Sequence, residues 1–145
     1  ILILGFGGAS QAIFYGLVFN GYKNVYVFNR SKKPIRINNI NTYTKKYSLA
    51  DKYLKSADLI INTTPIKPLS KKQISLVKKN TIISDIVYSP KNTMFLKQFA
   101  QNKKIYGISM LVEQALPCFN QWFGFVPVVD EYLIKKLHKK IKWLN

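Results

Sequence analysis

The amino-acid sequence predicts an α/β fold, with a doubly wound, mostly parallel sheet and helices at the C-terminus. Short apolar runs of strand length alternate with segments of helical periodicity along the 145 residues. This alternation is typical of parallel sheets whose strands are joined by crossover helices. A glycine-rich loop also follows the first apolar run directly and precedes a helical segment. The length fits one domain of ordinary size.

The first half of the chain predicts a compact strand–helix–strand unit. Ile1 to Leu4 form a strand buried on both faces. Apolar and small residues from Ala9 to Leu17 recur at helical spacing, and Asn20-Gly21 ends that helix. Val25 to Phe28 form the second strand. The polar, basic stretch from Ser31 to Lys46 shows no helical pattern, so we expect no helix there.

The second half continues the alternation. We expect short helices at 49–55, 71–78 and 93–102, and strands at 59–62, 81–86 and 105–106. A longer helix is expected from Met110 to Phe123, which Pro117 should kink or interrupt. A basic amphipathic helix is expected from Asp130 to Leu144, with Leu133, Leu137, Ile141 and Leu144 on one face.

The net charge of +17 suggests nucleic acid as one class of partner. The composition argues against that class, because 21 of the 23 cationic residues are lysine and only 2 are arginine. Surfaces that read bases or clamp phosphates usually use more arginine. The lysines are also scattered along the chain, and Lys, Asn, Ile, Tyr and Phe are all residues that A and T alone can encode. We therefore expect a compositionally biased surface and no nucleic-acid partner.

Cysteine usage and hydropathy indicate the cellular compartment of the protein and whether it contacts a membrane. The single cysteine, Cys118, permits no disulfide within the chain and no cysteine-rich metal site. That usage fits a reducing compartment, so we expect a cytoplasmic protein. No apolar run approaches the ~18 residues that a membrane-spanning helix needs, and we expect no membrane partner.

The glycine loop reads Gly5-Phe6-Gly7-Gly8-Ala9-Ser10, with the spacing G-x-G-x-x-S. The first glycine permits a tight turn, and the second lets the backbone approach a pyrophosphate at the helix N-terminus. Ser10 replaces the usual third glycine, and its small side chain still allows close packing of helix and strand. Its hydroxyl is also expected to reach a phosphate. In this strand–turn–helix context the motif predicts a Rossmann-like dinucleotide site.

The end of the second strand favours NADP over NAD. It reads Asn29-Arg30-Ser31, without the Asp or Glu that usually binds the ribose 2′-hydroxyl of NAD. A guanidinium at Arg30 suits a 2′-phosphate and can stack on adenine. Asn29 and Ser31 can add hydrogen bonds, while Lys32 and Lys33 add positive charge.

Taken together, these segments resemble the cofactor-binding half of shikimate dehydrogenase. The matching stretches occur in the family's order and span nearly the whole chain. They are ILILGFGGASQAI, NVYVFNRS, Asp58 to Pro65, Asp85 to Pro90, and Gly107 to Ala115, with Trp122-Phe123-Gly124 ending the helix that this last stretch begins.

The resemblance implies a set of binding roles. The loop residues Gly5, Phe6, Gly7, Gly8, Ala9 and Ser10 hold the pyrophosphate, and Asn29, Arg30 and Ser31 hold the 2′-phosphate ribose. The cofactor trough is lined by Thr63 and Thr64, and the nicotinamide is bordered by Ile86, Gly107 and Met110. Tyr88 and Gln114 reach the shikimate hydroxyls or carboxylate.

The resemblance also implies an activity, the reversible NADPH-dependent reduction of 3-dehydroshikimate to shikimate in aromatic amino acid biosynthesis. The family's catalytic Lys and Asp lie in an N-terminal substrate domain that has no counterpart here. The chain starts at Ile1, within an apolar run, which we interpret as a fragment of a longer protein. We expect residues 1–124 to bind NADP and residues 125–145 to pack on the substrate domain. Alone, this chain should bind NADP and turn over nothing.

Several departures and alternatives stay open. Ser109 replaces a glycine that the family usually has beside the nicotinamide. Pro34 stands where the family often has another phosphate-binding cation, and the second crossover is short. His138 is expected to be a surface residue.

The alternative functions are the cofactor half of a related quinate/shikimate-type dehydrogenase and a degenerate basic binding module without activity. The oligomeric state is also open, with a homodimer of the full-length enzyme as one alternative.

Overall fold

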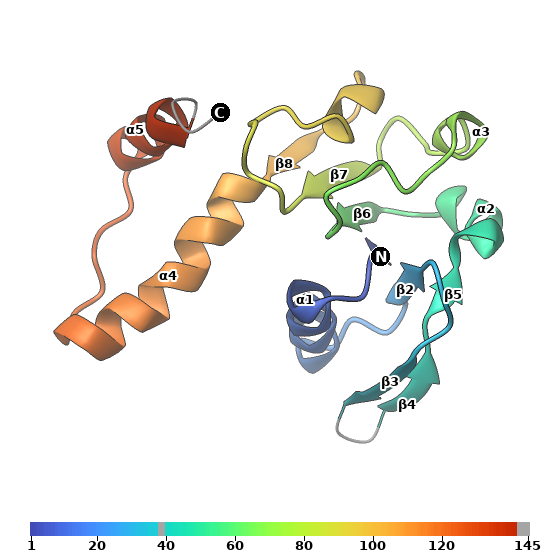
Figure 1. Ribbon diagram of the computed structural model, residues 1–145, viewed down its shortest axis with the longest axis horizontal. Coiled ribbons are helices and arrows are strands. Elements are labelled where there is room, and N and C mark those ends of the chain that lie inside the picture. Colours follow the sequence, from blue (N-terminus) through green and yellow to red (C-terminus); the bar gives the residue numbers. More distant parts are fainter. Residues whose placement is uncertain (38–39, 142–145) are drawn as a thin grey trace.

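The structure is a computed structural model that describes residues 1–37 and 40–141 (Figure 1). Its centre is a six-stranded sheet in which every neighbouring pair is parallel. The strand order is β5-β2-β1-β6-β7-β8. The strands are β1 (Leu2–Leu4), β2 (Tyr26–Asn29), β5 (Lys45–Lys46), β6 (Leu59–Asn62), β7 (Ile82–Asp85) and β8 (Lys104–Tyr106).

This order has the pattern 3-2-1-4-5-6 of dinucleotide-binding folds. The first strand is central, because Ile3 pairs in register with Val27 of β2 on one side and with Ile61 of β6 on the other. The chain first builds outward from β1 to β5 and then crosses back to β6. The carboxyl ends of β1 and β6 therefore flank the point at which the order reverses, where open α/β sheets bind ligands. The predicted doubly wound, Rossmann-like fold is confirmed.

Alternate residues of the strands build two cores, one on each face of the sheet. Leu2, Leu4 and Phe28 face a core that is covered by the 3₁₀ turn η1 (Tyr47–Leu49) and by segments that include α2 (Asp51–Leu54). Ile3 and Val27 face the opposite core. The first core also contains Ala50, Leu54, Ala57, Ile60, Leu69, Ile83, Phe95, Leu96 and Phe99, and the second contains Phe14, Ile35 and Ile61.

The second core is covered by helix α1 (Gly8–Phe19) and by a small β-hairpin. The hairpin pairs β3 (Pro34–Ile37) with β4 (Ile40–Tyr43) in antiparallel register. It occupies the crossover between β2 and β5, where a helix is usual in this type of fold. Within the described residues 31–37 and 40–46 no helix forms, as expected, and the hairpin was not predicted from the sequence.

Two expected helices are wrong in extent. The helix expected at 71–78 is the single turn α3 (Lys71–Ile74), and the helix expected at 93–102 is only the 3₁₀ turn η2 (Leu96–Gln98). In the second case Phe95, Leu96 and Phe99 are all buried in the same core. Burial of adjacent side chains requires a compact, irregular segment, so tertiary packing overrides the helical spacing.

The chain ends in two helices that project from the β8 edge of the sheet (Figure 1). Helix α4 (Gly107–Phe123) runs unbroken through Pro117, so interruption is wrong and a kink at Pro117 stays a prediction. Pro117 cannot donate to the carbonyl of Glu113, but both residues are exposed and water can satisfy that carbonyl. Helix α5 (Glu131–Ile141) begins where the Asp130 carboxylate accepts a hydrogen bond from the Leu133 amide, 2.7 Å long. The expectations for the side chains of His138 and Ile141 and for Leu144 lie outside the described part.

No helix within residues 1–37 and 40–141 is long and apolar enough to span a membrane. The same described residues contain no cluster of three or more His, Cys, Asp or Glu side chains suited to a metal ion.

Candidate dinucleotide site

The glycine loop begins at Gly5, directly after β1. Its φ of +109° is a backbone conformation that favours glycine. A Cβ built on Gly5 would collide with the Thr63 hydroxyl and lie 2.8 Å from a methyl carbon of Thr64. The Gly5 amide meanwhile donates to the Phe28 carbonyl at 2.8 Å. Gly5 therefore joins the ends of three strands at a place that no other residue fits.

The N-terminus of α1 presents its backbone N–H groups to solvent. Gly7 is the N-cap residue, no side chain caps the helix, and its first turn contains no acidic residue. Gly7 and Gly8 are exposed, and no atom lies within 4 Å of a Cβ built on either. Uncapped amides at the positive end of a 12-residue helix are a ready anion site. These residues fit the pyrophosphate of a dinucleotide.

Ser10 has a structural role instead of the predicted phosphate contact. Its side chain is fully buried, and its hydroxyl donates a 2.8 Å hydrogen bond to the Gly5 carbonyl. A side chain at 0% exposure cannot reach a ligand in the crevice. The prediction that its hydroxyl reaches a phosphate is therefore wrong, while the prediction that a small residue is needed here agrees with the packing.

A cavity of about 330 Å³ lies at the carboxyl ends of β1, β2, β5 and β6. It brings the expected pyrophosphate loop and the expected 2′-phosphate residues together. Arg30 is exposed at its rim and pairs with no carboxylate among the residues that the structure describes. Its lining comprises Gly5, Phe6, Gly7, Asn29, Arg30, Lys33, Tyr47, Thr63, Thr64, Pro65 and Ile66.

Asn29 is turned toward its own loop, because its amide donates to the Ser31 carbonyl at 3.2 Å. That carbonyl also accepts from the buried Thr44 hydroxyl at 3.1 Å, which ties the loop after β2 to the strand end of the hairpin. The Thr44 hydroxyl in turn accepts from the Lys33 amide at 2.9 Å. These bonds fix the backbone conformation of the loop after β2, which contains Arg30 and Lys33.

The loop after β6 lies between the cavity described above and two further cavities at the end of β7. Both the amide and the hydroxyl of Thr63 donate to the Leu4 carbonyl at 2.8 Å, which fastens β6 to β1 beside Gly5. Thr64 and Pro65 line the cavity described above and also two further cavities, of about 370 and 430 Å³, at the ends of β6 and β7. The crevice thus extends across the strand switch, as an extended dinucleotide requires.

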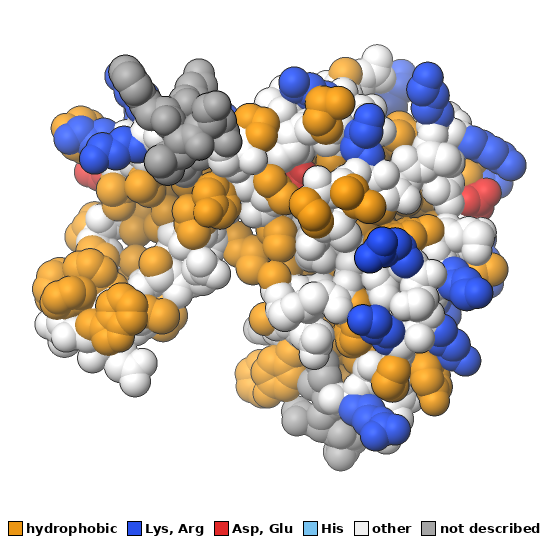
Figure 2. All heavy atoms as spheres, viewed as in Figure 1, with side chains coloured by type: hydrophobic (Ala, Val, Ile, Leu, Met, Phe, Trp, Pro, Cys, Tyr) orange, Lys and Arg blue, Asp and Glu red, His pale blue; other side chains and the backbone are white. Residues whose placement is uncertain are grey.

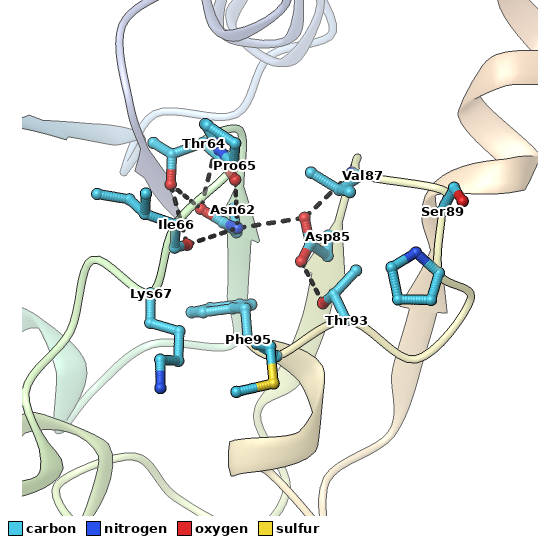
Figure 3. A pocket seen from close by; sticks show the side chains of 12 residues that line it. Asn62, Thr64, Pro65, Ile66, Lys67, Asp85, Val87, Ser89, Thr93 and Phe95 are labelled. Atoms are coloured by element: carbon cyan, nitrogen blue, oxygen red, sulfur yellow. Dashed lines mark hydrogen bonds between the residues drawn. The ribbon is translucent and has the colours of Figure 1, made fainter. Parts of the chain in front are cut away.

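A buried carboxylate organises the second half of this crevice (Figure 3). Asp85 accepts hydrogen bonds from the Asn62 amide at 3.2 Å, the Val87 backbone amide at 3.1 Å and the Thr93 hydroxyl. Asn62 also donates to the Thr64 carbonyl at 2.9 Å. Burial raises the pKa of the Asp85 carboxyl, although its three hydrogen bonds act in the opposite direction. This network gives Asp85 a structural role.

The expected nicotinamide residues lie directly after β7 and in the first turn of α4, which follows β8. Ile86 and Tyr88 line the cavity of about 430 Å³ together with Thr63 and Thr64. Gly107 is buried, and a Cβ there would collide with the backbone of Ile86 and lie 2.8 Å from that of Val87.

The remaining predicted residues are not part of these cavity walls. Met110 is half-buried and Gln114 is exposed on α4. The other predicted residues that line none of the three cavities are Gly8, Ala9, Ser10, Ser31 and Gly107.

The cavity lining includes side chains that were not among the predicted site residues, namely Lys33, Tyr47, Pro65 and Ile66. Lys33 was expected to add positive charge and to compensate for the missing phosphate-binding cation at Pro34, whereas Tyr47 was not considered. Tyr47 lies at the end of the irregular segment whose strands were not recognised. Its position becomes visible only when β5 is paired with β2, through Phe28↔Lys45 and Asn29↔Lys46.

Comparison with known proteins bears on this site. No protein-family model matches the chain. It is 35% identical over 153 aligned positions to the shikimate dehydrogenase (NADP(+)) of Bartonella quintana, covering 94% of this chain and 52% of the relative. It is 38% identical to that of Bacillus cereus, with coverages of 94% and 55%. Over nearly its whole length the chain is therefore similar in sequence to shikimate dehydrogenases.

The chain spans about half the length of the curated shikimate dehydrogenases that it matches. Among solved structures, the shikimate 5-dehydrogenase of Thermus thermophilus in complex with NADP(H) and shikimate is similar with a TM-score of 0.72 and 25% identity, over 97% of this chain and 54% of the other. A quinate dehydrogenase of Corynebacterium glutamicum in complex with NAD shares the fold, with a TM-score of 0.69 and 20% identity over 88% of this chain and 50% of the other.

Proposed function

We propose that this chain is the NADP(H)-binding half of a shikimate dehydrogenase, which interconverts 3-dehydroshikimate and shikimate. The main support for the proposal is that the expected pyrophosphate site and the expected 2′-phosphate site lie in the same crevice. The uncapped N-terminus of α1 and the exposed Arg30 meet at the strand switch point. The relationship to NADP(+)-dependent shikimate dehydrogenases supports this cofactor and this substrate.

NADP is favoured over NAD by the charges at the end of β2. Asn29 presents no negative charge to a 2′-phosphate, and Arg30 and Lys33 both border the cavity. A guanidinium and an ammonium at this place favour a phosphate over a ribose hydroxyl. The bound nicotinamide would supply or accept the hydride. The chain's own residues would position it, with Ser31 beside the 2′-phosphate, and Ile86, Gly107 and Met110 around the ring.

The substrate would be bound between this chain and a separate substrate domain. We assign Tyr88, exposed at the end of β7, and Gln114, exposed on α4, to contacts with the shikimate hydroxyls or carboxylate. No residue of this chain is assigned a catalytic proton transfer. In the full-length enzyme that step would fall to a lysine and an aspartate of the substrate domain, as the family resemblance implies.

The end of α4 and the segment that follows it expose large apolar side chains. They cluster on the arm formed by α4 and α5, away from the sheet (Figure 2). Trp122 is 74% exposed and Val128 is 87% exposed. An exposed apolar cluster of this kind is typical of an interaction surface. We assign segment 125–145 to packing against the substrate domain, and residues 1–124 to the cofactor-binding domain.

Calorimetric titration of the chain with NADP⁺ and, separately, NAD⁺ tests the cofactor assignment. We expect NADP⁺ to bind more tightly, and Arg30→Ala to remove most of that preference. Arg36→Ala is the matched control, because Arg36 lies on the hairpin and not in the cofactor cavity. Failure of the wild-type chain to bind either dinucleotide would refute the proposal. Steady NADPH production from shikimate by the isolated chain would refute the assignment of catalysis to another domain.

The substrate assignment needs the full-length protein. Quinate is the competing substrate, because a quinate dehydrogenase shares this fold. The ratio of kcat/KM for shikimate to that for quinate decides between them, and a ratio above one supports shikimate.

We place the enzyme in the cytoplasm and assign it no nucleic-acid or membrane partner. DNA retention that NADP⁺ does not compete away would contradict that assignment.

A further inference from the structure

Tyr47 lies at the same edge of the sheet as the cofactor loop. It directly follows β5, whose last pair with β2 is Lys46 with Asn29. Because the strands are parallel, the residues after β5, β2 and β1 all meet at one edge. Tyr47 accordingly lines the same cavity as Gly5 and Arg30.

The backbone of Tyr47 is held by a buried side chain from another element. Its carbonyl accepts hydrogen bonds from the Gln73 side-chain amide at 2.8 Å and from the Ala50 amide at 3.0 Å. Gln73 is itself fixed, because it forms a capping box with Ser70 and donates to the Asp51 carboxylate at 3.0 Å. The position of Tyr47 is therefore set before any ligand arrives.

The ring of Tyr47 is also restrained. It is half-buried and packs against the core cluster that contains Leu4 and Ala50. A side chain already held by packing loses little rotamer freedom on binding, so a contact from it costs less entropy than one from a free surface side chain.

The surroundings of the phenol keep it a neutral hydrogen-bond donor. Burial raises the pKa of the Tyr47 phenol, while the positive charge of Arg30 and the Gly5 backbone amide act in the opposite direction. Both of these groups attract the phenol oxygen. The hydroxyl proton is then left to donate to an acceptor in the cavity.

We propose that Tyr47 is a cofactor-binding residue whose hydroxyl donates to a sugar or diphosphate oxygen in the adenosine half of the dinucleotide. This inference rests on the proposed function. The place of Tyr47 beside Gly5, at the pyrophosphate loop, assigns it to the part that NADP and NAD share. Arg30 discriminates between the two cofactors, whereas Tyr47 contributes equally to both.

The test is calorimetric titration of Tyr47→Phe with NADP⁺, NAD⁺ and ADP-ribose. Loss of one hydrogen bond, typically about 0.5–1.5 kcal/mol, corresponds to affinities that are roughly twofold to tenfold weaker. We expect the same factor for all three probes, so the preference for NADP⁺ over NAD⁺ is unchanged. Tyr53→Phe is the matched control, because Tyr53 packs on the same core but lines a cavity with Tyr26, Ser56 and Asp58 instead. It should bind all three probes as the wild type does.

Wild-type affinities in Tyr47→Phe would overturn the inference while leaving the proposed function intact. A loss confined to NADP⁺ would overturn the assignment to the shared part. Loss of a cooperative thermal transition in Tyr47→Phe would mean that the hydroxyl serves folding, and would also overturn it. If the wild-type chain bound no dinucleotide at all, the proposed function itself would fail and this inference with it.

Discussion

The Ser10 hydroxyl donates a 2.8 Å hydrogen bond to the carbonyl of Gly5, across the turn from β1 into α1. Both residues are buried. The bond closes the glycine loop on its inner side, so that the loop amides of Gly7 and Gly8 face outward at the helix N-terminus. A serine at the third position of the motif thus supports the loop without touching the ligand.

Ser10→Ala should therefore lower stability and leave cofactor affinity nearly unchanged. Removing the hydroxyl leaves the Gly5 carbonyl without that partner, which typically costs about 1–3 kcal/mol. Chemical denaturation should show this decrease in the free energy of unfolding, while the Kd for NADP⁺ stays that of the wild type, because the buried hydroxyl does not face the cofactor cavity. The exposed Ser48→Ala is the control for the substitution itself. An unchanged free energy of unfolding combined with a large loss of NADP⁺ affinity would show that the Ser10 hydroxyl does contact a phosphate.

The start of α4 requires a glycine because of its contact with the end of β7. A Cβ on Gly107 would collide with the Ile86 backbone, which cannot move aside without disturbing the sheet. We expect Gly107→Ala to lower the free energy of unfolding by about 1–3 kcal/mol. Gly16→Ala is the matched control, because Gly16 lies inside α1 with nothing within 4 Å of an added Cβ. That change should raise stability by about 0.5–1 kcal/mol. Equal effects of the two substitutions in denaturation curves would contradict this account.

The parts of the site that could be predicted from sequence depend on local chemistry. The glycine loop and the end of β2 are each encoded within a few consecutive residues, and their strand–turn–helix setting is visible in the sequence. The structure brings Gly5, Gly7, Asn29 and Arg30 into one cavity, as the motif predicts. Burial and side-chain direction are not local properties, which is why the outward role expected for Ser10 was wrong.

The remaining differences arise where tertiary contacts decide the local structure. The hairpin was not predicted, because the alternation of Ile35 and Ile37 with polar residues is too short to indicate a strand by itself. Its stability as a hairpin depends on Ile35 reaching the second core. The contribution of Tyr47 was hidden for the same reason, because it depends on pairing of β5 with β2.

The buried carboxyl of Asp85 predicts a specific pH dependence of stability. Burial raises its pKa above the ordinary value of 3.8, so the folded chain holds this proton more tightly than the unfolded chain does. The resulting stabilisation is complete below the unfolded pKa and is lost as the pH rises through the folded pKa.

Asp85→Asn should remove this contribution, and its carboxamide can still accept from the Val87 amide and donate to the Thr93 hydroxyl. We expect the free energy of unfolding of the variant to fall less steeply than that of the wild type as the pH rises from roughly 4 to 7. Urea denaturation across that range measures the difference, and the exposed Asp58→Asn is the control. An identical pH dependence in wild type and Asp85→Asn would show that the carboxyl does not titrate in this way.

The hairpin should be as essential to the fold as the helix whose place it occupies. Ile35 is only 2% exposed and packs in the second core with Ile3, Phe14 and Val27. Ile35→Ala removes buried methyl and methylene groups and leaves a cavity, a change that typically costs about 2–5 kcal/mol. Ile105→Ala is the control, because Ile105 is 42% exposed on the edge strand β8. Thermal denaturation should show a large decrease in Tm for Ile35→Ala and a small one for the control. Because β3 and β4 lead directly into β5, the same variant should also weaken NADP⁺ binding through displacement of Tyr47. A variant with the Tm of the control would show that the hairpin lies on the sheet without stabilising it.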